Sequence, residues 1–248
     1  MSVKLVSITQ PSLEKEMTPE EFVVYIARVS NPSNQMNTET TPRLINYLIK
    51  HKHWSPFEFV DMTVEIVTRR SIAAQILRHK SFAFQEFSQR YSSVTNIQEI
   101  ELRKQAEKNR QSSAELYNPE WVGGVQLSDI VSGHFQASLN LYNEMIDAGI
   151  AREVARDILP LATETTMYMK GSLRSWITYL NVRLHNTTQK EHRDIAVQIK
   201  EILIQQFPII SSAMHNFDDF SDLPVDETLP IEAVQRLNEM AVKAKQQH

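Results

Sequence analysis

Residues 60–77 read VDMTVEIVTRRSIAAQIL, and the fold class follows from this stretch. Its first half alternates apolar and polar side chains, the pattern of a half-buried strand, with apolar positions at Val60, Met62, Val64 and Ile66. Its second half repeats apolar residues at helical spacing, at Ile72, Ala73, Ile76 and Leu77. The chain therefore passes from strand to helix near Arg69 or Arg70. We predict an α+β fold in which helices pack on a mixed or antiparallel sheet.

Helix signals lie upstream of this strand. Residues 18–21 (TPEE) form a capping box with proline at the first helical position, which predicts a helix to about Val29. Thr41 and Pro42 begin a second predicted helix.

Downstream, residues 97–125 are polar and poorly periodic, which predicts a surface insertion. Ser128 is expected to cap a long helix closed by Gly149, and residues 163–169 are β-branched and aromatic like a strand. Ser172 is expected to cap a helix to Leu184, and Thr187 or Thr188 another to Phe207. We predict one domain over residues 1–215, followed by an acidic tail and a last helix over 216–248.

Composition excludes several classes of protein. The chain has 248 residues with 26 basic and 30 acidic side chains, so its net charge of −4 gives no general attraction to nucleic acid. The longest wholly apolar run, residues 22–27, is far shorter than the ~20 residues of a membrane span. The first residues lack the charged-then-apolar pattern of a leader segment, so none is expected. We therefore expect a soluble cytoplasmic protein.

The rare residue types restrict the chemistry. Cysteine is absent, which excludes disulfides, thiolate metal sites and cysteine nucleophiles, and no metal site is predicted. The five glycines form no phosphate-binding loop. Any phosphate must therefore be bound mostly by side chains.

Positive charge is concentrated in residues 69–91. Five cations there face a single acid, Glu86, and they are Arg69, Arg70, Arg78, Lys80 and Arg90. Gln75, Arg78 and His79 are spaced to share one side of the final helical turn, where they can converge on one ligand. A solvated helix end with cations near its C-terminus explains the same spacing.

Residues 78–91 (RHKSFAFQEFSQRY) resemble the signature of flavin-dependent thymidylate synthases, in which Arg-His-Arg is followed by seven residues and then a serine. The third basic residue is Lys80 here. Further blocks of the resemblance are residues 53–58 (HWSPFE), 151–160 (AREVARDILP), 171–174 (GSLR) and 180–184 (LNVRL), in the family's order.

This resemblance implies reductive methylation of dUMP to dTMP. Methylenetetrahydrofolate would donate the carbon, FAD would carry the hydride and NADPH would reduce the flavin. It also implies a homotetramer whose active sites are shared between subunits, with no nucleic-acid or membrane partner.

The resemblance also implies a set of flavin-binding residues. These are His53, Ser55, Arg78, His79, Lys80, Glu86, Ser172, Leu173, Arg174 and Thr178. Ser172 and Thr178 stand where the family prefers asparagine, and a family histidine is replaced by Thr187.

The expected dUMP site places side chains around the phosphate and one cation against the uracil. Its residues are Gln75, Arg78, Glu86, Phe87, Ser88, Gln89, Arg90, Arg156 and Arg183. Attack by C5 of the pyrimidine on the methylene group leaves negative charge on the ring carbonyls, which a fixed guanidinium stabilises as it develops. Arg183 is therefore the expected catalytic residue.

Three alternative interpretations remain open. Arg183 can instead be an exposed helix residue, since Asn181 and Asn186 lie nearby. Capture of the methylene by water would give hydroxymethylated dUMP from nearly the same site. A single-stranded nucleic-acid module would use the cations of residues 69–90 with Phe82, Phe84, Phe87 and Tyr91 as stacking platforms.

Overall fold

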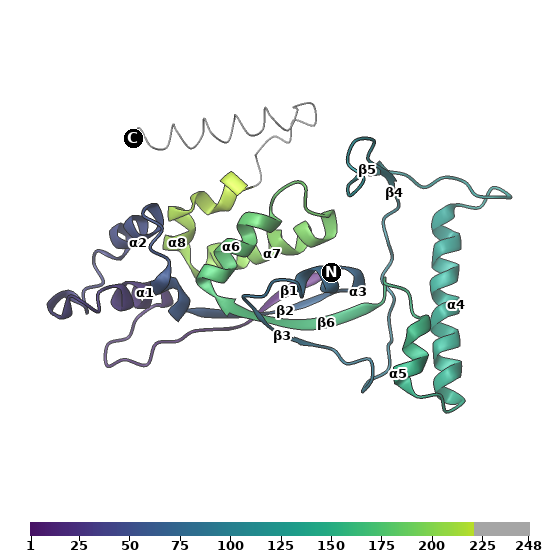
Figure 1. Cartoon of the computed structure of the whole chain (residues 1–248), viewed down its shortest axis with the longest axis horizontal. Helices are drawn as coiled ribbons and strands as arrows, with labels where there is room; N and C mark the ends of the chain where they lie inside the picture. Colours follow the sequence, from purple (N-terminus) through teal and green to yellow (C-terminus); the bar gives the residue numbers. More distant parts are fainter. Residues whose placement is uncertain (221–248) are drawn as a thin grey trace.

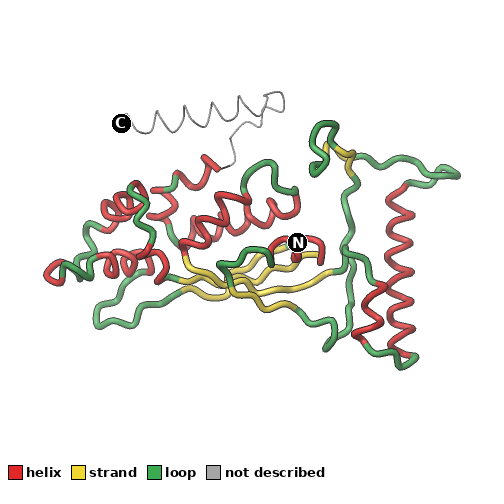
Figure 2. The backbone as a smooth tube through the Cα atoms, viewed as in Figure 1, coloured by secondary structure: helices red, strands yellow, loops and turns green. Residues whose placement is uncertain are grey.

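The computed structural model describes residues 1–220, drawn in colour in Figure 1 and by element type in Figure 2. The strands are β1 (Ser2–Ile8), β2 (Asp61–Arg69), β3 (Ala83–Glu86), β4 (Arg103–Gln105), β5 (Ser113–Leu116) and β6 (Glu164–Ser172). The α-helices are α1 (Pro19–Ala27), α2 (Thr41–Lys50), α3 (Arg70–Ile76), α4 (Leu127–Asp147), α5 (Arg152–Ala155), α6 (Leu173–Arg183), α7 (Lys190–Gln206) and α8 (Pro208–Ala213). The 3₁₀ turns are η1 (Pro32–Asn34), η2 (Ser55–Phe59), η3 (Arg156–Ile158) and η4 (His215–Phe220).

A four-stranded sheet in the order β1-β2-β6-β3 forms the centre of the molecule, and all its pairs are antiparallel. β2 and β6 pair along their whole length, from Asp61 opposite Ser172 to Arg69 opposite Glu164. The α+β class and the passage from strand to helix at Arg70 are confirmed. Of the two predicted alternatives, a mixed or an antiparallel sheet, the antiparallel one is correct.

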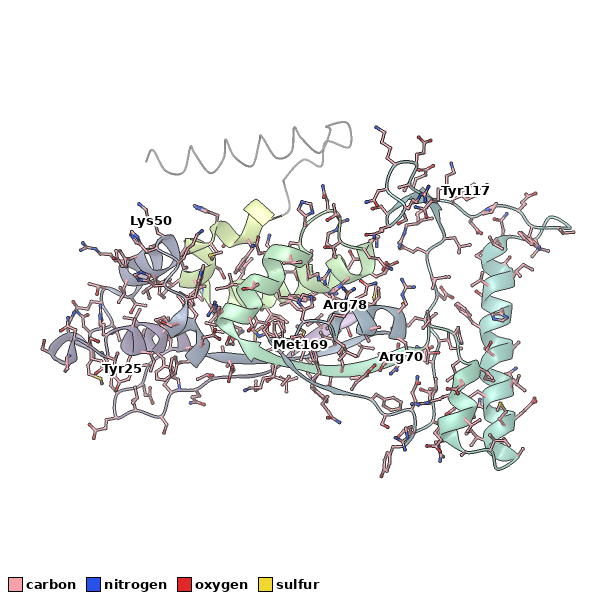
Figure 3. All side chains as sticks on the ribbon, in the orientation of Figure 1. Tyr25, Lys50, Arg70, Arg78, Tyr117 and Met169 are labelled. Atoms are coloured by element: carbon pink, nitrogen blue, oxygen red, sulfur yellow. The ribbon has the colours of Figure 1, made fainter. Side chains whose placement is uncertain are left out.

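One face of the sheet is buried under helices. Met62, Val64 and Ile66 on β2 are fully buried, as the alternation in the sequence predicts. Helices α6 and α7 lie over this face in Figure 1, and Figure 3 places Met169 of β6 beneath them. Trp176 of α6 donates its indole N–H to the Met62 carbonyl at 3.1 Å, which satisfies a polar group inside the core.

The opposite face of the sheet carries polar pairs between neighbouring strands. Tyr168 donates its hydroxyl to Glu65 directly opposite, at 2.8 Å, and Lys170 pairs with Asp61 at 2.8 Å. These cross-strand pairs explain why this face tolerates solvent.

Helices α4 and α5 form an arm beside the sheet (Figure 1). Tyr142 is the buried residue of α4, and it packs in a small cluster with Val94 and Ala155, with the predicted inner positions Leu139, Met145 and Ile146 alongside. Gly149 after the helix has φ of +85°, a left-handed conformation that favours glycine. Most of residues 97–125 lie at the surface. They include the β4–β5 ribbon, and Tyr117, which is labelled in Figure 3, directly follows β5.

Two of the four predicted helix caps are correct. Thr18 and Glu21 form the capping box of α1, and Ser172 accepts the backbone N–H of Ser175. Ser128 does not cap α4, because Gln126 holds the N-cap position and Ser128 bonds to Asn118 instead. Thr187 and Thr188 do not cap α7, whose N-cap residue is Gln189.

The predicted acidic tail and last helix lie outside the described residues apart from their first five positions. These positions belong to η4, and Phe217 of η4 is fully buried in the hydrophobic core. Within residues 1–220, no helix combines the length and apolar character that a bilayer crossing requires.

A side chain at Gly171 should destabilise the fold. A Cβ at this position of β6 would lie 2.5 Å from the Phe82 ring, which is itself packed against Trp176 at 4.6 Å between centroids. We expect Gly171→Ala to lower the free energy of unfolding by about 1–3 kcal/mol, measured by urea denaturation. Gly133→Ala is the control, because a Cβ there meets nothing within 4 Å. In the interior of α4 it should raise stability by roughly 0.5–1 kcal/mol. Equal effects of the two substitutions would contradict the packing described.

Candidate active site

Two distant segments of the chain meet at the centre of the candidate site. Arg183 ends α6, and His79 follows α3 in the loop that leads to β3. The Nε–H of Arg183 donates to Nε2 of His79 at 2.9 Å. The predicted catalytic arginine and the central histidine of the basic motif are therefore in direct contact.

This hydrogen bond requires a neutral imidazole, and the surroundings of His79 supply the reason. The ring is partly buried and lies 4.9 Å from that of Tyr179. Burial, followed by the positive charges of Arg183 and Arg78, lowers the pKa of His79 to about 4. At neutral pH the imidazole keeps a free lone pair at Nε2 to accept the arginine proton.

Gln75 lies in the same group. Its Oε1 is 3.3 Å from Nδ1 of His192, and His192 Nε2 is 3.1 Å from the Tyr179 hydroxyl. Its amide nitrogen donates to Oε1 of Gln189 at 2.7 Å. Gln75 and His79 thus both face the adjoining parts of α6 and α7, as their helical spacing predicts, while Arg78 is exposed beside them (Figure 3).

A second group surrounds Glu86 at the end of β3. Arg70 and the hydroxyl of Thr165 both donate to Oε1 of Glu86, each at 2.9 Å. Arg70 also lines a pocket of about 260 Å³ together with Gln89 and Arg156. Two expected dUMP residues therefore share one cavity next to the Glu86 ion pair.

The expectation that five cations face a single acid is wrong. Arg69 pairs with Glu191 at 2.7 Å, and Arg90 pairs with Glu153 at 3.3 Å, so acids from remote segments neutralise them. Within the described part of the chain, Arg78 and Lys80 have no ion pair. The positive charge that remains available is thus concentrated next to His79.

A third group lies where β6 passes into α6. Glu58 accepts the Ser172 hydroxyl at 2.5 Å and the Arg174 guanidinium at 3.0 Å. Thr178 donates to the carbonyl of Arg174 one turn earlier, at 2.9 Å. Leu173 is fully buried, and its N–H donates to the Val60 carbonyl at 2.8 Å.

The remaining predicted residues are dispersed over the surface. Ser55 begins η2, and the exposed His53 ring lies 5.9 Å from that of Tyr47. Phe87 and Ser88 are exposed after β3, and no base within residues 1–217 hydrogen-bonds to the Ser88 hydroxyl. One copy of the chain therefore does not gather all the predicted residues into one cavity.

Sequence reasoning missed three contributors to the group around Gln75. Tyr179 lies one turn before Arg183 on α6, so its spacing was a usable signal. His192 and Gln189 stand at the start of α7 among polar residues, where the pattern does not distinguish buried from exposed side chains.

The neutral state of His79 predicts a pH dependence of stability. Its pKa falls from 6.5 to about 4 on folding, so the unfolded chain binds more protons between these values. Lowering the pH through this range therefore favours unfolding. We expect urea denaturation to show that the wild type loses stability relative to His79→Gln as the pH falls from about 6.5 to 4. A difference that stays constant with pH would contradict a neutral His79.

Comparisons with known proteins identify the family of the chain. A family model described as thymidylate synthase complementing protein matches residues 12–209. A probable flavin-dependent thymidylate synthase of Paramecium bursaria Chlorella virus 1 is 48% identical, over 86% of this chain and 99% of that protein. A flavin-dependent thymidylate synthase of Synechocystis sp. is 46% identical over the same shares.

A solved structure shares the fold. It is the UMP/dUMP methylase PolB from Streptomyces cacaoi bound with 5-Br dUMP, with a TM-score of 0.69 and 24% identity. The alignment covers 86% of this chain and 94% of that chain. From the family match over most of its length and from relatives at 46% and 48% identity, this chain belongs to the family of flavin-dependent thymidylate synthases.

Proposed function

We propose that this enzyme methylates dUMP reductively to dTMP, with FAD, NADPH and methylenetetrahydrofolate, at a site centred on Arg183. The observation that carries the proposal is the contact between Arg183 and a neutral His79 at 2.9 Å. It holds a cation in place without neutralising it, because the partner is not an acid.

The contact leaves the reactive end of Arg183 available. A guanidinium has five N–H donors, and His79 engages the one on Nε. The terminal nitrogens of Arg183 have no hydrogen-bond partner within the described residues. They are suited to face a pyrimidine carbonyl that gains negative charge when C5 attacks the methylene group. Partial burial of Arg183 strengthens this interaction, since less water screens it.

The flavin fits the same neighbourhood on chemical grounds. Arg78 and Lys80 are exposed cations next to His79, and FAD has a pyrophosphate that needs such partners in a chain without a phosphate loop. When bound, FAD supplies the hydride that converts the methylene group to methyl. His53, Ser55, Glu86, Ser172, Leu173, Arg174 and Thr178 complete the proposed contacts. Of these, Arg174 and Ser172 are pre-positioned by Glu58.

The phosphate of dUMP is the proposed ligand of Arg156, Arg90 and Gln75, with Ser88 and the backbone of Phe87 and Gln89. Arg156 belongs to the arm, where α5 is followed by η3. The same arm exposes large apolar side chains, among them Ile130, Leu141 and Val154. Exposed apolar surface of this kind marks protein interfaces. We propose that copies of the chain assemble through it into a homotetramer, which brings Arg156 of one copy to Arg183 of another.

An anaerobic reaction tests the proposal. Purified protein is incubated with FAD, NADPH, methylenetetrahydrofolate and dUMP, and the nucleotide product is identified by mass. We expect dTMP. A hydroxymethylated dUMP would favour the alternative reaction, and an unchanged dUMP would contradict both.

Arg183→Ala should lose turnover while it keeps the flavin. Loss of one electrostatic stabiliser costs roughly 10²–10³ in kcat. The flavin absorbance of the purified variant and its rate of dTMP formation are the two measurements. A near-normal rate would remove Arg183 from the mechanism.

Shared sites predict complementation between two inactive variants. Arg156→Ala and Arg183→Ala each damage every site of their own oligomer. In a mixed oligomer, some sites receive an intact Arg156 from one copy and an intact Arg183 from another. We expect dTMP formation to reappear after subunit exchange, up to about a quarter of the wild-type rate for random mixing of two-subunit sites. Exchange confirmed by mass spectrometry without any recovery would show that both arginines serve from one subunit.

A further inference from the structure

A continuous chain of hydrogen bonds runs from buried Tyr179 to Glu191 and includes Gln75. Its links are Tyr179 hydroxyl to His192 Nε2 at 3.1 Å, His192 Nδ1 to Gln75 Oε1 at 3.3 Å, Gln75 Nε2 to Gln189 Oε1 at 2.7 Å, and Gln189 Nε2 to Glu191 Oε2 at 2.9 Å. His192 and Tyr179 are buried in the core, whereas Gln75 reaches its edge.

Glu191 sets the direction of this chain. Its other carboxylate oxygen contacts Arg69 at 2.7 Å and Arg103 at 2.5 Å. Burial alone would raise the pKa of Glu191, but the hydrogen bond from Arg103 and the nearby charge of Arg69 hold it at about 2. An ionised carboxylate only accepts hydrogen bonds, so Gln189 must turn its NH₂ group toward Glu191.

The remaining orientations follow one from another. With its NH₂ group on Glu191, Gln189 presents its carbonyl oxygen to Gln75 and must receive an N–H there. Gln75 then turns its own oxygen to His192, which donates from Nδ1. Nε2 of the neutral ring accepts the Tyr179 hydroxyl. Burial, followed by the positive charge of Arg183 and the electrostatic interaction with His79, lowers the pKa of His192 to about 3, which keeps the ring neutral.

We infer that His192 is a positioning residue that, together with Gln189, holds the Gln75 carboxamide with its NH₂ side available to the nucleotide. One hydrogen of this group bonds to Gln189, and the second is free to donate to an acceptor such as a phosphate oxygen. A flipped carboxamide would present its oxygen to the anion instead. The inference rests on the proposed function, in which Gln75 faces the phosphate of dUMP.

The test compares two variants that differ only at residue 192. Tyr179→Phe keeps the donation from Nδ1 to Gln75, whereas Tyr179→Phe/His192→Phe replaces both buried polar partners by apolar rings. Loss of both partners leaves no buried group unsatisfied between them, so the double variant should fold. The dissociation constants of dUMP and of uncharged deoxyuridine are measured on the flavin-loaded enzymes by calorimetry.

We expect the double variant to bind dUMP about tenfold more weakly than Tyr179→Phe, with deoxyuridine affinity unchanged. His192→Asn, which has an amide donor near the position of Nδ1, should recover most of the dUMP affinity. Equal dUMP affinity in the two variants would overturn the inference. Equal losses for both ligands would also overturn it, because they would indicate a structural role. Failure of the unsubstituted enzyme to bind or methylate dUMP would instead overturn the proposed function.

Discussion

The hydrogen bond from Arg183 to His79 is the contact on which the candidate site depends. It joins a cation to an imidazole that must stay unprotonated, and burial together with the charges of Arg183 and Arg78 ensures this. The guanidinium thereby keeps its full positive charge and most of its donors. An acid in place of His79 would neutralise the charge of Arg183. A fully exposed histidine would be free to take up a proton, and its positive charge would then repel the guanidinium.

The sheet brings these two residues together. β2 and β6 are antiparallel, so α3 begins beside Arg69 at one end of the pair and α6 begins after Ser172 at the other. The 11 residues of α6 extend about 16 Å back across the buried face, which returns Arg183 toward the end of α3. The close approach of Phe82 to Gly171 fixes the loop that carries His79 along the same path.

Local patterns predicted the parts of the fold that are local in origin. Alternation identified β2, helical spacing identified α3, and Thr18 and Ser172 marked helix starts. The candidate site followed from the motif around His79 and from the resemblance. The partners of the charges were not predictable, because Glu191 and Glu153 come from remote segments that only the tertiary fold brings to Arg69 and Arg90. The hydrogen-bond chain through His192 was missed for the same reason.

In the proposed function dUMP contacts two copies of the chain, because Arg156 follows α5 of the arm whereas Arg183 ends α6. The exposed apolar residues of the arm supply a reason for such an assembly. A crystal structure of the flavin-loaded protein with dUMP tests this claim most directly. We predict the uracil carbonyls against Arg183 of one subunit and the phosphate against Arg156 of another. A nucleotide that contacts both arginines of a single subunit, or neither of them, would contradict the account.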